Sequence, residues 1–340
     1  MPSPLAWSSS GRRAVPRLTV PDRAGRRVTF VPVSCCVCGR SDAVQVAAGQ
    51  DYEYETTADE FRVVRCFGCG LHYLNPRPSM ADLPVIYPPT YYAYNYETQV
   101  SSISRKAKEW LDARRARDWL SVASTQRPRF LDVGCGDGRY LHMFHGWSVP
   151  KEHLWGTELD EKVVSRINED GYQVRYGPVE EIRDLPESFF DLIVMLQVLE
   201  HVADPPAVVE RLTKLLAPKG ILVIETPSTE SLDFRLFGRR YWGGYHFPRH
   251  WNWFDRATLS RLVTELGLEV ARVRYIPAPS FWGYSFHHVV KYAWGCPRLA
   301  RLCNPLQHAW SAAFATSFDL FRAALGGATS NIQLIARRAA

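Results

Sequence analysis

The feature that most constrains the fold of this 340-residue chain is a glycine-rich turn between a buried strand and a helix. The segment LDVGCGDGRY at 131–140 places glycines at 134, 136 and 138. Glycines let the backbone turn tightly and approach a ligand, and the helix that follows presents unpaired N–H groups. A dinucleotide site usually has the spacing G-x-G-x-x-G, whereas this turn has G-x-G-x-G followed by Arg139. This departure argues against a nicotinamide or flavin dinucleotide.

Strand and helix patterns alternate from residue 128 onward, and this alternation predicts a parallel α/β sheet. The predicted strands are RFLDV (129–133), HLWGTE (153–158), QVRYG (173–177), FDLIVML (190–196), GILVIET (220–226), LEVARVRY (268–275) and NIQLIARR (331–338). Helices are expected from about 138, up to Asn168, over 205–217 and over 256–266. A charged amphipathic helix over 104–126 should precede them, with Trp110, Leu111, Ala113, Trp119 and Leu120 as its apolar residues.

The chain divides into four regions by composition. Residues 1–30 hold six arginines and one acid, hence most of the net charge of +6, and we expect a disordered tail there rather than a transit peptide. Cysteine pairs fill 31–80, a Tyr/Pro-rich connector and a helix fill 81–127, and the α/β domain fills 128–340. The nearly neutral body argues against a nucleic-acid scaffold. No apolar run is long enough to cross a membrane.

Two matched CxxCG units predict a structural Zn²⁺ site of four thiolates, Cys35, Cys38, Cys66 and Cys69, because a closed tetrahedral set leaves no open position. Unrelated buried cysteines are the alternative. A strand-rich excursion over 41–65 should separate the pairs, and Cys36 could compete with Cys35. Cys135, Cys296 and Cys303 have no metal partner by spacing, so we expect free thiols. This sparse cysteine usage indicates a reducing compartment, and we expect the cytoplasm.

Two carboxylates flank the glycine turn. The second predicted strand ends at Glu158, where a carboxylate suits a bidentate hydrogen bond to a ribose diol. Asp132, immediately before the glycines, can reach a bound ammonium group.

The motifs LDVGCGDG, GTELD, FDLIVMLQVLEHVADP and LLAPKGILVIETPS, in this order, resemble those of class I S-adenosylmethionine-dependent methyltransferases. The resemblance covers roughly 104–275 and the last strand. It implies a Rossmann-like seven-stranded sheet of order 3-2-1-4-5-7-6 with strand seven antiparallel. It also implies that the methionine moiety, ribose and adenine of the cofactor lie against Asp132, Gly134, Cys135, Gly136, Glu158, Leu159, Val179, Glu180, Gln197 and His201.

The cysteine pairs, followed by NPRP at 75–78, resemble an N-terminal zinc segment found on a subset of these enzymes. That subset includes sugar C-methyltransferases of antibiotic pathways, which implies a small-molecule acceptor such as a sugar, polyketide, other natural product or lipid-like compound. Those enzymes carry a Glu-His pair before an aromatic-Phe ending. This chain has Arg249-His250, so the His matches and Arg replaces Glu, which argues against sugar C-methylation specifically.

The stretch YWGGYHFPRHWNWF at 241–254 is the richest in groups that could assist methyl transfer. A base near neutral pKa suits the removal of an acceptor proton. We expect His250 as the first candidate for that base, with a structural hydrogen bond to backbone as the equal alternative. His246, Glu225 and Tyr245 are lesser candidates, and Glu225 could instead be an acceptor ligand or a capped loop residue.

About 55 residues (276–330) separate the last two strands, too many for a bare loop. Its helical and aromatic runs predict a helical insertion at the cofactor edge of the sheet. A lid over the acceptor pocket is the favoured interpretation. A dimer face and a membrane-surface contact, as in ubiquinone-type O-methyltransferases, remain open. Two other functions also remain open: an RNA methyltransferase or RNA-binding protein with a zinc ribbon, and a non-catalytic partner subunit that retains the fold.

Overall fold

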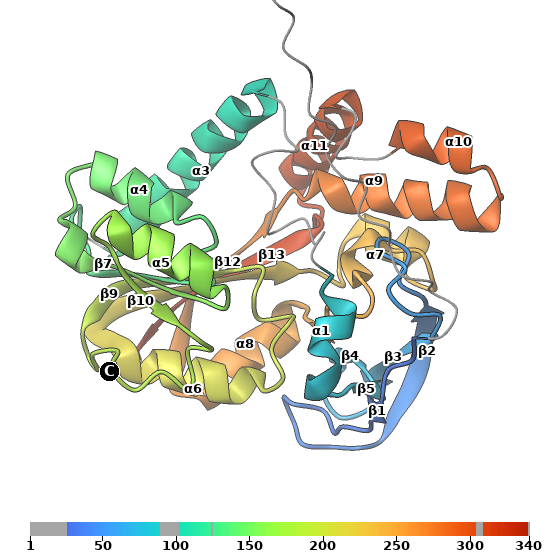
Figure 1. Cartoon of the computed structure of the whole chain (residues 1–340), viewed down its shortest axis with the longest axis horizontal. Coiled ribbons are helices and arrows are strands. Elements are labelled where there is room, and N and C mark those ends of the chain that lie inside the picture. The colour runs from blue at the N-terminus through green and yellow to red at the C-terminus, as the bar shows by residue number, and fades with distance from the viewer. Residues whose placement is uncertain (1–25, 89–101, 124, 304–308, 339–340) are drawn as a thin grey trace, which may run out of the picture.

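The computed structural model describes residues 26–88, 102–123, 125–303 and 309–338. Most of the predicted disordered tail and the Tyr-rich part of the connector lie outside the described residues. A seven-stranded sheet forms the centre of the molecule (Figure 1). Its strands are β6 (Phe130–Val133), β7 (Leu154–Glu158), β8 (Gln173–Tyr176), β9 (Phe190–Leu196), β10 (Leu216–Pro227), β12 (Leu268–Ile276) and β13 (Asn331–Arg338).

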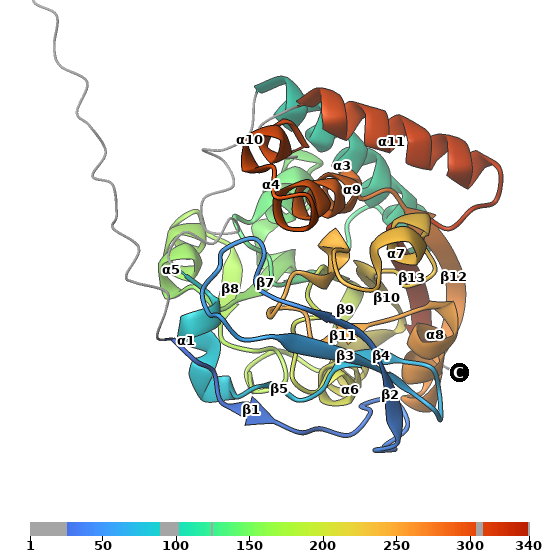
Figure 2. The ribbon, with the colours of Figure 1, turned by 90° about the vertical axis from the view of Figure 1, so that its right-hand side faces the viewer.

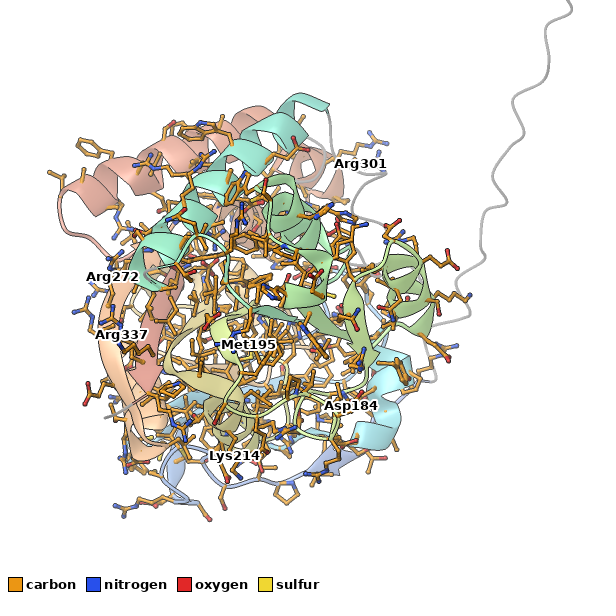
Figure 3. All side chains as sticks on the ribbon, turned by 90° about the vertical axis from the view of Figure 1, so that its left-hand side faces the viewer. Asp184, Met195, Lys214, Arg272, Arg301 and Arg337 are labelled. Atoms are coloured by element: carbon orange, nitrogen blue, oxygen red, sulfur yellow. The ribbon has the colours of Figure 1, made fainter. Side chains whose placement is uncertain are left out.

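The strand order is β12-β13-β10-β9-β6-β7-β8. The pairs β6–β7, β7–β8, β6–β9 and β9–β10 are parallel, whereas β13 runs antiparallel to both β10 and β12. Numbered along the α/β domain, this is the order 3-2-1-4-5-7-6 with strand seven antiparallel, so the predicted fold is confirmed. Met195 of β9 lies at the centre of the molecule, and Arg272 and Arg337 mark the β12–β13 edge (Figure 3).

Helices cover both faces of the sheet (Figure 1). One face carries α3 (Ser102–Ala123), α4 (Arg139–Gly146) and α5 (Glu161–Glu169), and the other carries α6 (Pro205–Leu215) and α8 (Arg256–Glu265). Local sequence sets their starts: the Asp160 side chain accepts the N–H groups of Lys162 and Val163 at the start of α5. Helix α6 ends two residues earlier than predicted, because Pro218 favours an extended Ala217.

Helix α3 differs from its prediction in which apolar residues it buries. Trp119 and Leu120 are buried against the sheet, but Trp110 is 61% exposed and Leu111 45% exposed. The buried face carries polar residues instead, because Asp112 lies there with 2% exposure. The spacing of the apolar residues therefore predicted the helix, but it did not predict which residues lie on its buried face.

The N-terminal region forms a four-stranded sheet of order β11-β4-β3-β2. Its strands are β2 (Ala43–Gly49), β3 (Phe61–Cys66), β4 (His72–Leu74) and β11 (Asn252–Trp253). Strand β11 comes from the predicted α/β domain, so the two regions share one sheet (Figure 2). The folded part also begins before residue 31: β1 (Phe30–Val31) pairs with β5 (Arg77–Pro78), and the N–H of buried Val28 donates to Asp59 Oδ2 at 2.9 Å.

The insertion between β12 and β13 is helical, as predicted. It consists of α9 (Pro279–His288), a π-helical turn η6 (Val289–Ala293), α10 (Pro297–Ala300), η7 (Arg301–Cys303) and α11 (Ala309–Ala324). Shorter elements are η2 (Met80–Asp82), α1 (Leu83–Ile86), η4 (Lys151–His153), α7 (Leu232–Phe237) and η5 (Gly243–Tyr245). In the described part of the chain, no helix has the length and apolar character that a membrane span requires.

Candidate functional site

The glycine turn joins β6 to α4 in left-handed backbone. Gly134, Gly136 and Gly138 have φ values of 71°, 53° and 77°, which other L-residues rarely adopt. Gly134 is also sterically required, because a Cβ there would lie 2.7 Å from Cγ2 of Val198 in the loop after β9. The turn therefore brings backbone close to the carboxyl ends of β6 and β9.

The two predicted carboxylates meet at this turn. Glu158 Oε2 accepts the N–H of Gly136 at 2.8 Å, and Oε1 accepts the N–H of Leu159 at 2.6 Å. Asp132 is 4% exposed, and burial raises its pKa to about 7 against the opposing effect of Arg139. An ammonium cation beside Asp132 would stabilise its ionised form, so the site fits an amino-acid ligand.

The other predicted cofactor residues differ in their burial and in their contacts. Gln197 follows β9 with φ 56°, and its buried side-chain Nε2 has no hydrogen-bond partner among the described residues, so it is a donor that a ligand could satisfy. Cys135 packs on Gly156, where a Cβ would lie 2.8 Å from the cysteine Sγ. Val179 is buried in the core, whereas Leu159 is 67% exposed. Burial raises the pKa of Glu180 above its usual value.

The four predicted zinc ligands lie together. Cys35 Sγ is 3.4 Å from Cys69 Sγ, and Cys38 Sγ is 3.4 Å from Cys66 Sγ, with all four sulfurs within 4.8 Å of one another. A tetrahedral zinc site with Zn–S bonds of about 2.3 Å requires sulfurs roughly 3.8 Å apart, so this donor set fits the ion. Cys36 lies outside this group, because its thiol donates to Asn252 Oδ1 at 3.5 Å.

Three histidines from two distant segments form one cluster, in which His246 and His250 are buried and His201 is partly exposed. The ring of His250 lies 4.5 Å from that of His201 and 5.0 Å from that of His246, between centroids. His250 Nδ1 donates to the Gly244 carbonyl at 2.9 Å, which leaves its Nε2 as the basic nitrogen, 3.9 Å from Glu200 Oε1. Burial and the neighbouring imidazoles lower the pKa of His250 well below its usual value, and that of His201 to about 3.

Glu200 is a carboxyl group that the sequence analysis did not select. It is fully buried beside the histidines, and burial raises its pKa to about 8 against the opposing effect of the Thr226 hydroxyl. A neutral carboxylic acid can donate a proton, whereas a carboxylate only accepts. The only sequence signal was its place in LEH, immediately before His201.

The loop after β2 supplies two more carboxylates that sequence reasoning missed. Asp51 forms a bidentate pair with Arg249, at 3.1 Å to Nη1 and 2.9 Å to Nη2, and neither side chain is exposed. Glu53 Oε2 lies 2.8 Å from His246 Nδ1. No local spacing indicated these pairs, because they join residues nearly 200 positions apart. They explain Arg249 as the partner of a buried carboxylate.

Glu225 and Tyr245 are held by structural contacts. The Glu225 carboxylate is paired with the guanidinium of Arg115 and accepts Gln333 Nε2 at 2.8 Å. The Tyr245 hydroxyl donates to the Gly238 carbonyl, and burial raises its pKa far above the usual value. Because both groups are committed to these partners, we do not propose either as a base.

A cavity of about 300 Å³ opens between the N-terminal sheet and the loops that follow His201 and His250. At the wall of this cavity, the Arg77 guanidinium stacks on the Trp251 ring, 4.7 Å from the ring centroid, and donates a hydrogen bond to the Ala203 carbonyl. Its lining residues are Val33, Ser34, Cys36, Tyr73, Leu74, Arg77, Ala203, Asp204, Trp251 and Asn252. None of the predicted cofactor residues is among them.

The sheet order and the glycine turn with its two carboxylates define a Rossmann-like domain. Residues 105–273 match the family model described as a methyltransferase domain. The chain is 32% identical over 133 residues to a ubiquinone biosynthesis O-methyltransferase of Dechloromonas aromatica, covering 36% of this chain and 56% of that relative. It is 28% identical over 193 residues to the protein of the same name from Bordetella avium, covering 52% and 78%.

Two solved structures are similar at lower identity. A SAM-dependent methyltransferase from Archaeoglobus fulgidus has a TM-score of 0.43 at 18% identity, over 68% of this chain and 94% of that one. The 1,6-didemethyltoxoflavin-N1-methyltransferase of Burkholderia thailandensis has a TM-score of 0.45 at 13% identity, over 82% and 96%. These scores lie below 0.5, so the assignment rests on the domain match and the strand order.

The chain belongs to the class I S-adenosylmethionine-dependent methyltransferases. It spans 56% of the length of the Dechloromonas relative, so the acceptor and partners of that enzyme do not transfer to it directly.

Proposed function

We propose that this protein transfers a methyl group from S-adenosylmethionine to a small-molecule acceptor. The observation that supports this most is the turn after β6, where buried Asp132, the Gly136 N–H and Glu158 meet at the sheet edge. Bound there, S-adenosylmethionine would supply a sulfonium methyl group that an acceptor atom attacks in line, with the thioether of S-adenosylhomocysteine as the leaving group.

The chain's own residues then have two tasks. Asp132, once ionised, pairs with an ammonium group, while Glu158 accepts hydrogen bonds from a ribose diol. The buried histidines hold and remove the acceptor proton in a site that excludes water. The insertion supports this exclusion: the Gly243 N–H donates to Ser285 Oγ at 2.8 Å, so α9 packs directly on the segment that carries His246.

We infer that the four cysteines hold one structural Zn²⁺. The ion would tie the turn after β1 to the end of β3 and so stabilise the sheet that β11 joins. Four thiolates persist in a reducing compartment such as the cytoplasm.

The acceptor is best sought among small aromatic, sugar or lipid-like compounds. The relatives with a printed name act in ubiquinone biosynthesis, and the cluster at His246 is lined by aromatic rings. A panel of a catechol, a nucleotide-linked sugar and a polyketide phenol, with radiolabelled methyl donor, tests this. Label transfer to one of them supports the proposal, and binding of donor without transfer to any of them contradicts it.

The outer face of the insertion suggests attachment to an anionic lipid surface. Phe314, Phe321 and Leu325 are 72%, 64% and 73% exposed. Arg298, Arg301 and Arg322 lie on the same insertion, whose one acid, Asp319, is fully buried. Apolar and cationic groups together suit acidic headgroups. Co-sedimentation with phosphatidylglycerol vesicles but not with phosphatidylcholine vesicles is expected, and equal binding or none contradicts it.

A further inference from the structure

The loop at 51–57 places one buried carboxylate on each of two residues of the 246–250 segment. Asp51 holds Arg249, and Glu53 holds His246 with Nδ1 to Oε2 at 2.8 Å. Both side chains of the Glu53–His246 pair are 6% exposed, so this is a desolvated contact. A buried carboxylate on one ring nitrogen fixes the orientation and tautomer of an imidazole, the arrangement that activates a histidine base in other enzymes.

The backbone conformation of His246 is a second, independent indication that this residue has a functional role. Its φ of 42° and ψ of 44° lie in the left-handed region, which a non-glycine residue adopts at a cost. Strained backbone of this kind concentrates at functional sites and persists where surrounding contacts hold it. Here the contacts come from both sides, because Glu53 binds the ring and α9 bonds η5, whose C-terminal cap is His246.

The two histidines of this segment differ in their partners. The Nδ1 of His250 donates to a neutral carbonyl, that of Gly244, and the surroundings of its ring are cationic or neutral. The Nδ1 of His246 instead faces an acid. Burial alone would raise the pKa of Glu53, but the His246 imidazole holds it below its usual value, so Glu53 is ionised at neutral pH. A carboxylate stabilises the imidazolium that forms when a base accepts a proton.

We propose that Glu53 is a positioning residue of the N-terminal region that orients His246 as the base for methyl transfer. With Nδ1–H donated to Glu53, the other ring nitrogen, Nε2, takes the proton that the acceptor loses on methylation. The imidazolium then releases that proton to water as product leaves, so no proton accumulates. The catalytic part of this role rests on the proposed function. The contact between Glu53 and His246 can be measured even if that function is wrong.

The test uses the full chain and three variants. Glu53→Gln keeps the shape of the side chain but removes its charge. Glu55→Gln is the matched control, because Glu55 lies two residues along the same loop and instead accepts from Lys291 Nζ at 2.8 Å. His246→Gln assigns the His246 resonances in spectra of protein labelled with ¹⁵N-histidine.

Other titratable and charged groups surround the pair. Among the described residues they include Tyr54, His201, Arg249 and His250 around His246, and His287, His288 and Arg249 around Glu53. In the wild type we expect His246 to carry its proton on Nδ1, with the downfield N–H shift of a carboxylate hydrogen bond. In Glu53→Gln we expect that shift to be lost. Glu55→Gln should leave it unchanged.

Turnover gives the second readout, with the acceptor that the panel identifies. Glu53→Gln should lower kcat by about 10- to 100-fold, less than the roughly 10²- to 10⁴-fold contribution of a general base because the base itself remains, while the donor Kd changes less than about twofold. Added to His246→Gln, it should cause no further loss. An unchanged His246 spectrum in Glu53→Gln, or a fully additive loss, overturns the proposal. If the wild type binds no methyl donor, the proposed function fails, and the spectra still decide the role of Glu53.

Discussion

The glycine turn and the histidine cluster are built in opposite ways. The turn is local: Asp132, Gly134 and Gly136 come from one segment, and Glu158 ends the adjacent strand. The cluster joins the loop after β2, the loop after β9 and the segment before β11, so its contacts join residues nearly 200 positions apart in the chain. Donor binding should therefore depend on the central sheet alone, whereas acceptor chemistry should depend on the N-terminal region as well.

The sharpest way to break this comparison is to remove the zinc. Cys66→Ser should abolish metal binding and methyl transfer, because structural zinc contributes roughly 10–16 kcal/mol to folding in small domains and the N-terminal sheet carries the loop at 51–57. The donor Kd should change less than about threefold. Elemental analysis measures the zinc content, and calorimetry measures the donor Kd. Cys36→Ser, outside the four-sulfur group, should keep its zinc, and loss of donor affinity in Cys66→Ser would refute the separation.

A second test concerns Glu225, which lies between the two regions and whose carbonyl accepts the Gln197 N–H at 2.8 Å. Arg115→Ala should lower the free energy of unfolding by about 3 kcal/mol, since it leaves the buried Glu225 carboxylate without its cation. Arg114→Ala, one position away on the exposed side of α3, should have a small effect. Chemical denaturation measures both, and equal stabilities would show that Glu225 does not need the pair.

Glu158→Gln probes the local region alone. Donor affinity should fall roughly thirtyfold, because a hydrogen bond to a charged acceptor contributes about 2 kcal/mol. Zinc content and the His246 spectrum should stay as in the wild type. Glu161→Gln, exposed at the start of α5, is the control. A change at His246 in Glu158→Gln would mean that the two regions are coupled after all.

The smallest expected effect is a pH dependence of donor binding. Burial raises the pKa of Asp132 to about 7, so below that pH the carboxyl is neutral and cannot pair with an ammonium group. Donor affinity should rise by up to about tenfold per pH unit below 7 and level off above it, with a proton released on binding. Calorimetry in two buffers of different ionisation enthalpy detects that proton. Asp132→Asn should remove the dependence, and a flat wild-type profile would contradict the assignment.

In the free protein the same pKa shift has the opposite consequence for stability. A folded-state carboxyl that keeps its proton up to about pH 7 stabilises the fold at low pH. That contribution is lost as the pH rises from the usual carboxyl pKa toward 7, because the unfolded state ionises first. Bound donor should therefore offset a destabilisation that the apo protein shows near neutrality.

The sequence predicted the parts of this molecule that depend on local patterns of residues. Strand order, the glycine turn and the grouping of the four cysteines followed from periodicity, spacing and resemblance. The sharing of β11 between the two regions could not be predicted, since Asn252 and Trp253 pair with residues some 180 positions earlier. The partners of His246 and Arg249 could not be predicted for the same reason. The burial of Asp112 on α3 could not be predicted either, because polar residues in a helix pattern are normally assigned to solvent.

The most direct test of the central claim is calorimetric titration of the purified protein with S-adenosylmethionine and with S-adenosylhomocysteine. The turn around Asp132 and the Glu158 carboxylate predict saturable one-to-one binding of both compounds in the micromolar range, weakened roughly thirtyfold in Glu158→Gln. Absence of binding by either compound at millimolar concentration would contradict the assignment of this edge of the sheet as a methyl-donor site.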